Sequence, residues 1–355
     1  MEGRRSLFLL FVLLLFVPMV IPLATHVRTT SMSRDALTAA SSRHASRMTE
    51  LLRNGYDLSS PFSPSSPRLD PANPVYNFLI SYYGLRGAKG VRRLSRYSPG
   101  MNVVMEGVSA DDVPSHLSLK HLRFVGGGGG GGGKGGAFYT AEGLNSTAQL
   151  RWNKNLLEAT QKRAPITNCY GLHEWAMIYG NDHASPAPSA DYQKGLELRI
   201  PQSVVDRTVD SSSLRCSHLD ALRMFSEKAK DEQANEFGRI EELDRSVDQP
   251  RLEQPACLHS NMDLLKWAWK LGPLLNSDLL CDVLELALEA RRVDVAASPY
   301  DASAFLAEPI RIETDEGRRI YKKKQIEIMK KSLSLRSRLI ESYDQVIAGA
   351  EQTNI

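Results

Sequence analysis

The chain has 355 residues, of which 42% are hydrophobic, so it can bury a sizeable core in one large domain or two modest ones. Its net charge of +3 is nearly balanced, which gives only weak support to a nucleic-acid partner. Four cysteines in a chain of this length exclude a disulfide-dense scaffold.

The first 24 residues have the pattern of a secretory-type signal. Arg4 and Arg5 precede an apolar run from residue 7 to residue 17, and small residues follow near Ala24. A membrane anchor is the alternative, but prolines at positions 18 and 22 interrupt the short run. We therefore expect residues 1–24 to be a signal segment and the mature protein to have no stable membrane span.

Residues 25–72 are rich in serine, threonine and arginine, poor in acids, and end in a Pro/Ser stretch. A transit-like segment behind a signal resembles the bipartite leaders of plastid proteins in algae with complex plastids. This predicts import into a plastid and a disordered linker. An ordinary disordered N-terminus in the secretory pathway is the alternative.

Residues 73–355 are expected to form a single, mainly α domain: a compact multi-helix fold with a few short strands. Residues 74–83 favour a helix, and residues 103–105 a short strand. From residue 126 to 136 every residue except Lys134 is glycine. A phosphate loop needs Ser or Thr directly after the lysine, but Gly135 stands there. We therefore expect a glycine-rich insertion loop at 108–145 and no nucleotide cofactor.

Three short segments each pair a cysteine with a histidine and have an acidic residue nearby. The pairs are Cys169/His173, Cys216/His218 and Cys257/His259. Thiolate, imidazole and carboxylate groups are ligands of zinc and iron. All of these residues cannot bind one tetrahedral ion, but three or four of them can, so the set predicts a zinc or iron site.

Carboxylates next to these pairs are candidates for acid–base catalysis. Glu174, Asp220 and Asp263 each lie within a few residues of a pair, where one of them could serve a catalytic zinc as general base. Ser217 and Ser260 stand three positions before the two aspartates, which fits the capping box at a helix start. Capping is therefore the structural alternative for both aspartates.

Neighbouring residues are candidates for substrate binding. Arg223 and Lys266 lie near the same expected helix starts, where they could hold an anionic substrate or neutralise the two aspartates. Trp175 could stack on a planar ligand or fill the core. Asn77 is a further candidate for substrate contact.

The C-terminal part has the clearest helical patterns. A helix after Ser260 should end at Gly272, because glycine accepts a left-handed conformation and Pro273 cannot continue the helix. Cys281 has no histidine nearby in the sequence and is expected to be a small buried residue. Residues 318–350 predict a long basic helix, with Arg336 as the polar break in its apolar stripe. That expected stripe consists of Ile326, Met329, Leu333, Ile340, Tyr343 and Ile347.

Several blocks resemble, in the same order, a family of bacterial and plastid-bearing-eukaryote proteins commonly labelled 3-methyladenine DNA glycosylase or glycosylase-like. The blocks are PVYNFLISYYGLR, RYSPG, CYGLHEWAM, LRCSHLDALRMF, EQPACLHSNMDLLKWAWKL, ASPYD and IRIETDEGRRIY. The resemblance covers about residues 73–321, without a recognisable helix-hairpin-helix motif. It implies excision of alkylated purines from damaged DNA without a cofactor.

Three functions are therefore open at the level of sequence. The first is a metal-dependent enzyme of small molecules that uses the Cys/His/carboxylate set. The second is the base-excision glycosylase that the resemblance implies, in which an aromatic pocket and an acid would receive a flipped base. The third is a non-catalytic organellar structural or assembly protein, in which Glu174, Asp220 and Asp263 would affect stability only.

Overall fold

Helices dominate the computed structural model, which describes residues 30–57, 68–125, 135–180, 196–232, 235–306 and 308–352. The α-helices are α1 (Arg34–Leu52), α2 (Asn77–Ser81), α3 (Gly87–Leu94), α4 (Ala148–Lys162), α5 (Leu172–Ala176), α6 (Gln202–Asp210), α7 (Leu219–Leu222), α8 (Glu227–Glu232), α9 (Arg245–Leu252), α10 (Leu258–Leu271), α11 (Ser277–Ala296) and α12 (Asp315–Gln352). The strands are β1 (Thr30–Met32), β2 (Val103–Glu106), β3 (Leu122–Val125) and β4 (Gly136–Tyr139). The expected mainly α class is confirmed.

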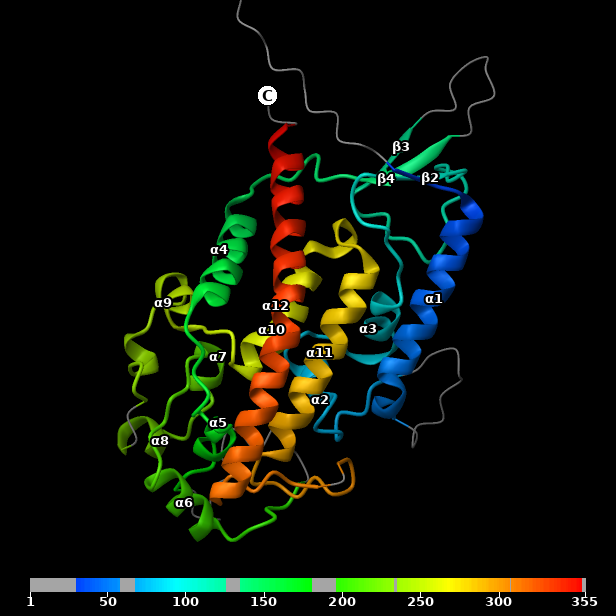
Figure 1. Cartoon of the computed structure of the whole chain (residues 1–355). Coiled ribbons are helices and arrows are strands. Elements are labelled where there is room, and N and C mark those ends of the chain that lie inside the picture. The colour runs from blue at the N-terminus through cyan, green and yellow to red at the C-terminus, as the bar shows by residue number, and fades with distance from the viewer. Residues whose placement is uncertain are drawn as a thin grey trace, which may run out of the picture.

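The centre of the fold is formed by α10, α11 and α12, which pack against one another (Figure 1). As predicted, α10 ends at Gly272, whose φ of 56° lies in the left-handed region. Asn276 then caps α11, because its side chain accepts a hydrogen bond from the Asp278 backbone N–H at 2.7 Å. The two helices are apolar along most of their length, and they supply much of the buried core.

The long helix α12 is confirmed, and Tyr343 and Ile347 of the expected stripe are buried, but the other stripe residues are only partly buried or exposed. Leu333 is 38% exposed, whereas Arg336 is buried and donates to Asn261 Oδ1 at 2.7 Å. Gln325 is also buried, and its amide donates to the Ile166 carbonyl at 3.3 Å. The helix thus turns Arg336 and Gln325 toward polar partners in α10 and in a preceding loop. The spacing of apolar residues in the sequence does not reveal these partners. Its buried residues include Tyr321, Ile328, Ser332, Leu339, Tyr343, Val346 and Ala350.

The N-terminal part of the folded region begins earlier than expected. Residues 1–29, which contain the signal-type segment, lie outside the described residues. The expected disorder of residues 25–72 is wrong for residues 30–57, because they contain β1 and α1. Ser33 caps α1, and Leu37, Met48 and Leu52 are fully buried in the core, where α1 packs against α11. The buried residues of α1 recur every three or four positions, which is the spacing of one helix face and not of a linker.

A small sheet covers one end of α1, in the order β1-β2-β4-β3 (Figure 1). The pair β1/β2 is parallel, and β4 is antiparallel to both β2 and β3. Leu122 pairs with Tyr139, and Val125 with Gly136. The expected loop at 108–145 is therefore wrong for the residues of β3 and β4, whereas residues 126–134 lie outside the described part of the chain.

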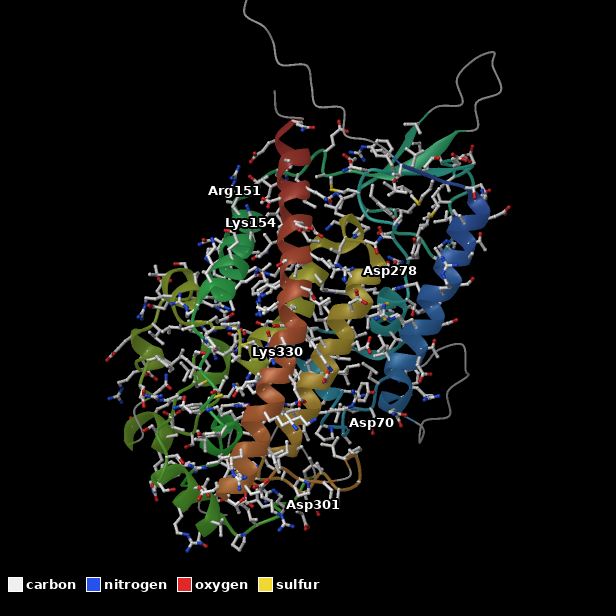
Figure 2. All side chains as sticks on the ribbon, in the orientation of Figure 1. Asp70, Arg151, Lys154, Asp278, Asp301 and Lys330 are labelled. Carbon is white, nitrogen blue, oxygen red and sulfur yellow. The ribbon has the colours of Figure 1, made fainter. Side chains whose placement is uncertain are left out.

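Helix α4 lies along the C-terminal half of α12. Figure 2 shows Arg151 and Lys154 on α4, and these side chains pair with Glu351 and Asp344 of α12. Such exposed pairs contribute little to stability. Of the helices in the described ranges, none combines the length and the apolar character that a bilayer span requires.

Candidate functional site

A cavity of about 300 Å³ opens where α2, α5, α7, α10 and α11 meet. Histidines, charged groups, aromatic residues and methionines all contribute to its wall. The lining residues are Asn77, Phe78, Tyr82, Tyr83, His173, Glu174, Met177, His218, Asp220, Ala221, Arg223, Met224, His259, Met262, Asp263, Lys266 and Arg291. An apolar cavity with a few convergent polar groups is the usual form of a small-molecule site.

Helix α5 brings His173 and Glu174 to the cavity. A tight turn precedes the helix: Tyr170 and Gly171 both have positive φ, at 51° and 72°. A side chain at Gly171 would bring its Cβ to 3.2 Å from the Tyr321 ring, so glycine is required by both conformation and space. The sequence Cys-Tyr-Gly-Leu-His-Glu therefore sets the direction from which the imidazole and the carboxylate enter the cavity.

The first set of polar side chains, which we name the two-histidine group, consists of His173, His259 and Asp294. The two imidazole rings lie perpendicular to each other, with centroids 4.1 Å apart. His173 Nε2 lies 3.6 Å from Asp294 Oδ1, and His259 Nε2 lies 3.7 Å from Asp294 Oδ2. One ligand atom from each residue can therefore face a common point.

Arg291 holds the two carboxylates beside this group. Its NH1 donates to Glu174 Oε1 at 2.9 Å and to Asp294 Oδ2 at 2.5 Å, and its Nε donates to the Pro74 carbonyl at 3.0 Å. The remaining oxygens, Glu174 Oε2 and Asp294 Oδ1, are buried without a hydrogen-bond partner among the described residues. Buried polar atoms normally have a partner, so two such oxygens beside two imidazoles are unusual.

The charges of this group depend on one another. Burial alone would raise the pKa of Glu174, but the charge of Arg291 and the contact with His173 outweigh it and lower this pKa to about 2. Burial raises the pKa of Asp294, with the Glu174 charge adding to the effect. Burial, together with the neighbouring His173, His218 and Arg291, lowers the pKa of His259 well below its usual range. His259 is therefore a neutral imidazole with a free electron pair to offer.

The second set, which we name the lysine-centred group, consists of His218, Asp220, Asp263 and Lys266. Lys266 Nζ donates to both aspartates at 3.2 Å. His218 Nε2 faces Asp263 Oδ2 at 3.3 Å, while its Nδ1 accepts from the Ala221 backbone N–H at 3.3 Å. Each ionic group here has an opposite charge within reach, so the group is internally neutralised.

The pKa values of the lysine-centred group follow from this pairing. Burial opposes ionisation of Asp263, but Lys266 and His218 outweigh it and depress the pKa of this carboxyl. Burial likewise opposes the charge on Lys266, yet the two aspartates raise its pKa. The pKa of His218 is raised, because Asp263 and Glu253 outweigh the effect of burial.

The three cysteines of the expected ligand set meet beside the two-histidine group. Cys169, Cys216 and Cys257 line a smaller cavity of about 20 Å³, whose wall also includes His173 and His259. Burial raises the pKa of each thiol. Cys169 Sγ accepts from Gln325 Nε2 at 3.2 Å, and Cys216 Sγ donates to the His218 carbonyl at 3.7 Å. Five of the six expected ligands thus line one small cavity, but among the described residues the groups close enough to hold one ion contain imidazoles and carboxylates and no thiol.

The other predicted residues lie either in the main cavity or in the core. Asn77, Arg223 and Lys266 line the main cavity, whereas Trp175 is fully buried in the core and donates to the Ala297 carbonyl at 2.8 Å. Trp175 therefore presents no face to a ligand. Cys281 is buried as expected, but the fold brings His44 Nδ1 within 3.3 Å of its sulfur.

The two expected capping boxes are wrong. Helix α7 is capped by His218, and α10 begins after Cys257 without a side-chain cap. Ser260 instead donates to the Gln254 carbonyl at 3.0 Å. Both aspartates instead accept hydrogen bonds from Lys266. A charged donor forms a stronger hydrogen bond than a backbone N–H at a helix start.

Sequence reasoning missed Arg291 and Asp294, although both are essential to the geometry. They stand three residues apart on α11, on the same face as Leu284 and Leu288. Two opposite charges on the buried face of an otherwise apolar helix are a recognisable signal of a buried polar site.

Comparisons with protein families, with curated proteins and with solved structures find no match for the chain. The function is therefore inferred from the side chains and their geometry. The cavity and the two groups of ionic side chains on its wall carry that inference.

Proposed function

We propose that the protein is a metal-dependent enzyme that acts on a small molecule in the 300 Å³ cavity, with His173, His259 and Asp294 as the metal ligands. The observation that carries the proposal is the buried Asp294 carboxylate, whose two oxygens lie 3.6 and 3.7 Å from His173 Nε2 and His259 Nε2, and whose Oδ1 has no hydrogen-bond partner among the described residues. A cation bound there would supply the partner that this oxygen lacks.

The spacing of the ligand atoms suits a transition metal. Ligand atoms about 2.0–2.2 Å from a tetrahedral ion lie roughly 3.4 Å from one another. The distances from His173 Nε2 and His259 Nε2 to Asp294 oxygens are 3.6 and 3.7 Å, so small shifts would close the site. Two histidines and one carboxylate are typical ligands of catalytic zinc and of non-haem iron, which both leave positions open for substrate or water.

Charge favours the two-histidine group over the lysine-centred group as the metal site. In the lysine-centred group, the Lys266 ammonium already occupies the space between Asp220 and Asp263. In the two-histidine group, Glu174 and Asp294 share the same guanidinium of Arg291. A further cation is therefore stabilised beside Asp294 and repelled beside Lys266.

Glu174 is the residue best placed to move a proton. It lines the cavity, whereas Asp294 lies behind it, and Glu174 Oε2 has no hydrogen-bond partner among the described residues. A metal ion at this position would supply Lewis-acid activation of a substrate or water. The low pKa of Glu174 keeps the carboxylate ionised but makes it a weak base, so it would accept a proton only from a group made acidic by the metal.

Elemental analysis of the purified full chain tests this proposal. We expect about one zinc or iron ion per chain, as for a catalytic site of this ligand type. Asp294→Asn and His259→Ala should lose the ion. Glu174→Gln should retain it, because this residue is assigned to proton transfer.

The controls separate loss of a ligand from loss of the fold. His44→Ala removes a buried histidine far from the cavity, whose Nε2 contacts the Leu94 carbonyl at 2.9 Å, and it should retain the ion. Cys169→Ser, Cys216→Ser and Cys257→Ser should also retain it. Metal-free wild-type protein, or an Asp294→Asn variant with a full metal content, would contradict the proposal.

A base-excision glycosylase is the second candidate, and the aromatic wall of the cavity favours it. Phe78 and Tyr83 pack edge to face with ring centroids 5.6 Å apart, and Tyr83 donates to Asp263 Oδ1 at 3.4 Å. A flipped base needs an aromatic pocket and an acid beside the glycosidic bond. Asp220 and Glu174 also line this cavity.

This second candidate predicts release of free 3-methyladenine from alkylated DNA. Glu174→Gln or Asp220→Asn should abolish the release while the far-UV circular dichroism spectrum stays unchanged. Phosphate contacts dominate DNA affinity, so binding should weaken steeply as salt rises. Absence of DNA binding at every salt concentration would rule the glycosylase out.

A further inference from the structure

We infer that the substrate is an anion with a flat apolar body, and that Arg223 binds its carboxylate or phosphate oxygens. This inference rests on the proposed metal-dependent function and names the substrate class of the same cavity. Three independent features of the cavity support it: an unused guanidinium, an aromatic wall and the balance of charges.

The guanidinium of Arg223 is poorly used within the protein. Among the described residues, its nearest recorded carboxylate oxygen is Asp220 Oδ1 at 3.9 Å, which is beyond hydrogen-bond distance. Asp220 is already paired with Arg245 and with Lys266, so it gains little from a third cation. The Arg223 side chain is 53% exposed and lines the cavity. Arginine binds planar oxyanions in a bidentate manner, and an entering carboxylate or phosphate would find this fork free.

Aromatic and methionine side chains in the lining of the cavity suit an apolar ligand body. Phe78 and Tyr83 line the cavity, as does Tyr82, which is 55% exposed. Met177 and Met224 complete the apolar surface. Aromatic faces and thioether groups favour flat or polarisable molecules over sugars and other strongly hydrated ones.

The charges around the cavity call for an anion once a metal is bound. Before that, the cations balance the carboxylates. The cations are Arg223, Arg245, Lys266 and Arg291, and the carboxylates are Glu174, Asp220, Asp263 and Asp294. The pair of His218 and Glu253 adds one group of each sign when His218 is protonated. A divalent ion would leave an uncompensated positive charge in a partly buried space, which is costly. An anionic substrate removes that charge, whereas a neutral or cationic one does not.

Calorimetric titration of the full chain with simple probes tests the inference. Benzoate and phenyl phosphate carry a ring and an oxyanion, and benzamide has the same ring without the charge. We expect both anions to bind more tightly than benzamide, and Arg223→Gln to weaken the anions about tenfold without changing benzamide binding. Arg92→Gln, which changes an exposed arginine of α3 outside the cavity, should match the wild type.

The titrations are run with zinc-loaded and zinc-free protein, and the zinc content of each sample is measured. Anions that bind no more tightly than benzamide, or equally to Arg223→Gln and wild type, would overturn the inference even where zinc is bound. Protein that takes up no zinc but binds anions through Arg223 would contradict the metal proposal alone. A preference for phenyl phosphate or for benzoate would identify which oxyanion the site selects.

Discussion

Replacing Arg291 by leucine is expected to lower the free energy of unfolding by about 3–5 kcal/mol, because removing one partner of a buried ion pair leaves its charges uncompensated. Arg291 is 7% exposed and pairs with Glu174 and Asp294, which are also buried. The variant would leave both carboxylates facing each other without a cation. Urea denaturation followed by circular dichroism measures the loss.

Two comparisons make this prediction specific. Arg338 pairs with Asp282 at 2.6 Å, but its side chain is 46% exposed, and Arg338→Leu should therefore cost at most about 1 kcal/mol. Zinc should restore part of the stability of Arg291→Leu, because an ion in the two-histidine group offsets the same charges and binds only the folded chain. Equal losses in the two variants would show that burial does not set the cost.

Replacing Trp267 by alanine is expected to destabilise the protein by about 3–5 kcal/mol, as for other large aromatic side chains removed from a core. Trp267 is 2% exposed on α10, where it packs edge to face with Trp152 at 6.1 Å between ring centroids. The ammonium groups of Lys266 and Lys270 lie 4.8 and 5.0 Å from its ring. Thermal and urea unfolding of the variant measure the cost.

Trp269 offers a matched control on the same helix. It is only half-buried, and the Arg93 guanidinium covers its ring at 4.9 Å. Trp269→Ala should therefore cost clearly less than Trp267→Ala, since less apolar surface returns to water. A larger loss for Trp269 would mean that α10 faces the core through its other side.

Much of the fold could be predicted from the sequence where local chemistry decides the structure. Gly272 and Pro273 end a helix by their own conformational limits, and the long apolar and basic pattern after residue 315 is helical in any context. The buried face of α12 could not be predicted in the same way. Arg336 and Gln325 lie inward because distant partners accept their hydrogen bonds.

The candidate site could likewise be predicted only in part from the sequence. The histidines and carboxylates near cysteines were visible as a pattern, and His173, His218 and His259 do line one cavity. That the thiols stay outside the groups close enough to hold one ion was not visible, because it depends on how α5, α7 and α10 are oriented in space. Asp220 and Asp263 fit a local capping pattern, but Lys266 binds both, Asp263 within the same helix and Asp220 from another part of the chain.

Two of the proposed ligands come from the consecutive helices α10 and α11, whereas the third comes from α5, which lies far away along the chain. None of the three helices could hold an ion by itself, since each contributes one donor. Loading must then follow the docking of all three helices, so metal content in a preparation would count the molecules that have completed folding. A variant in which these helices fail to dock would therefore be isolated with a low metal content.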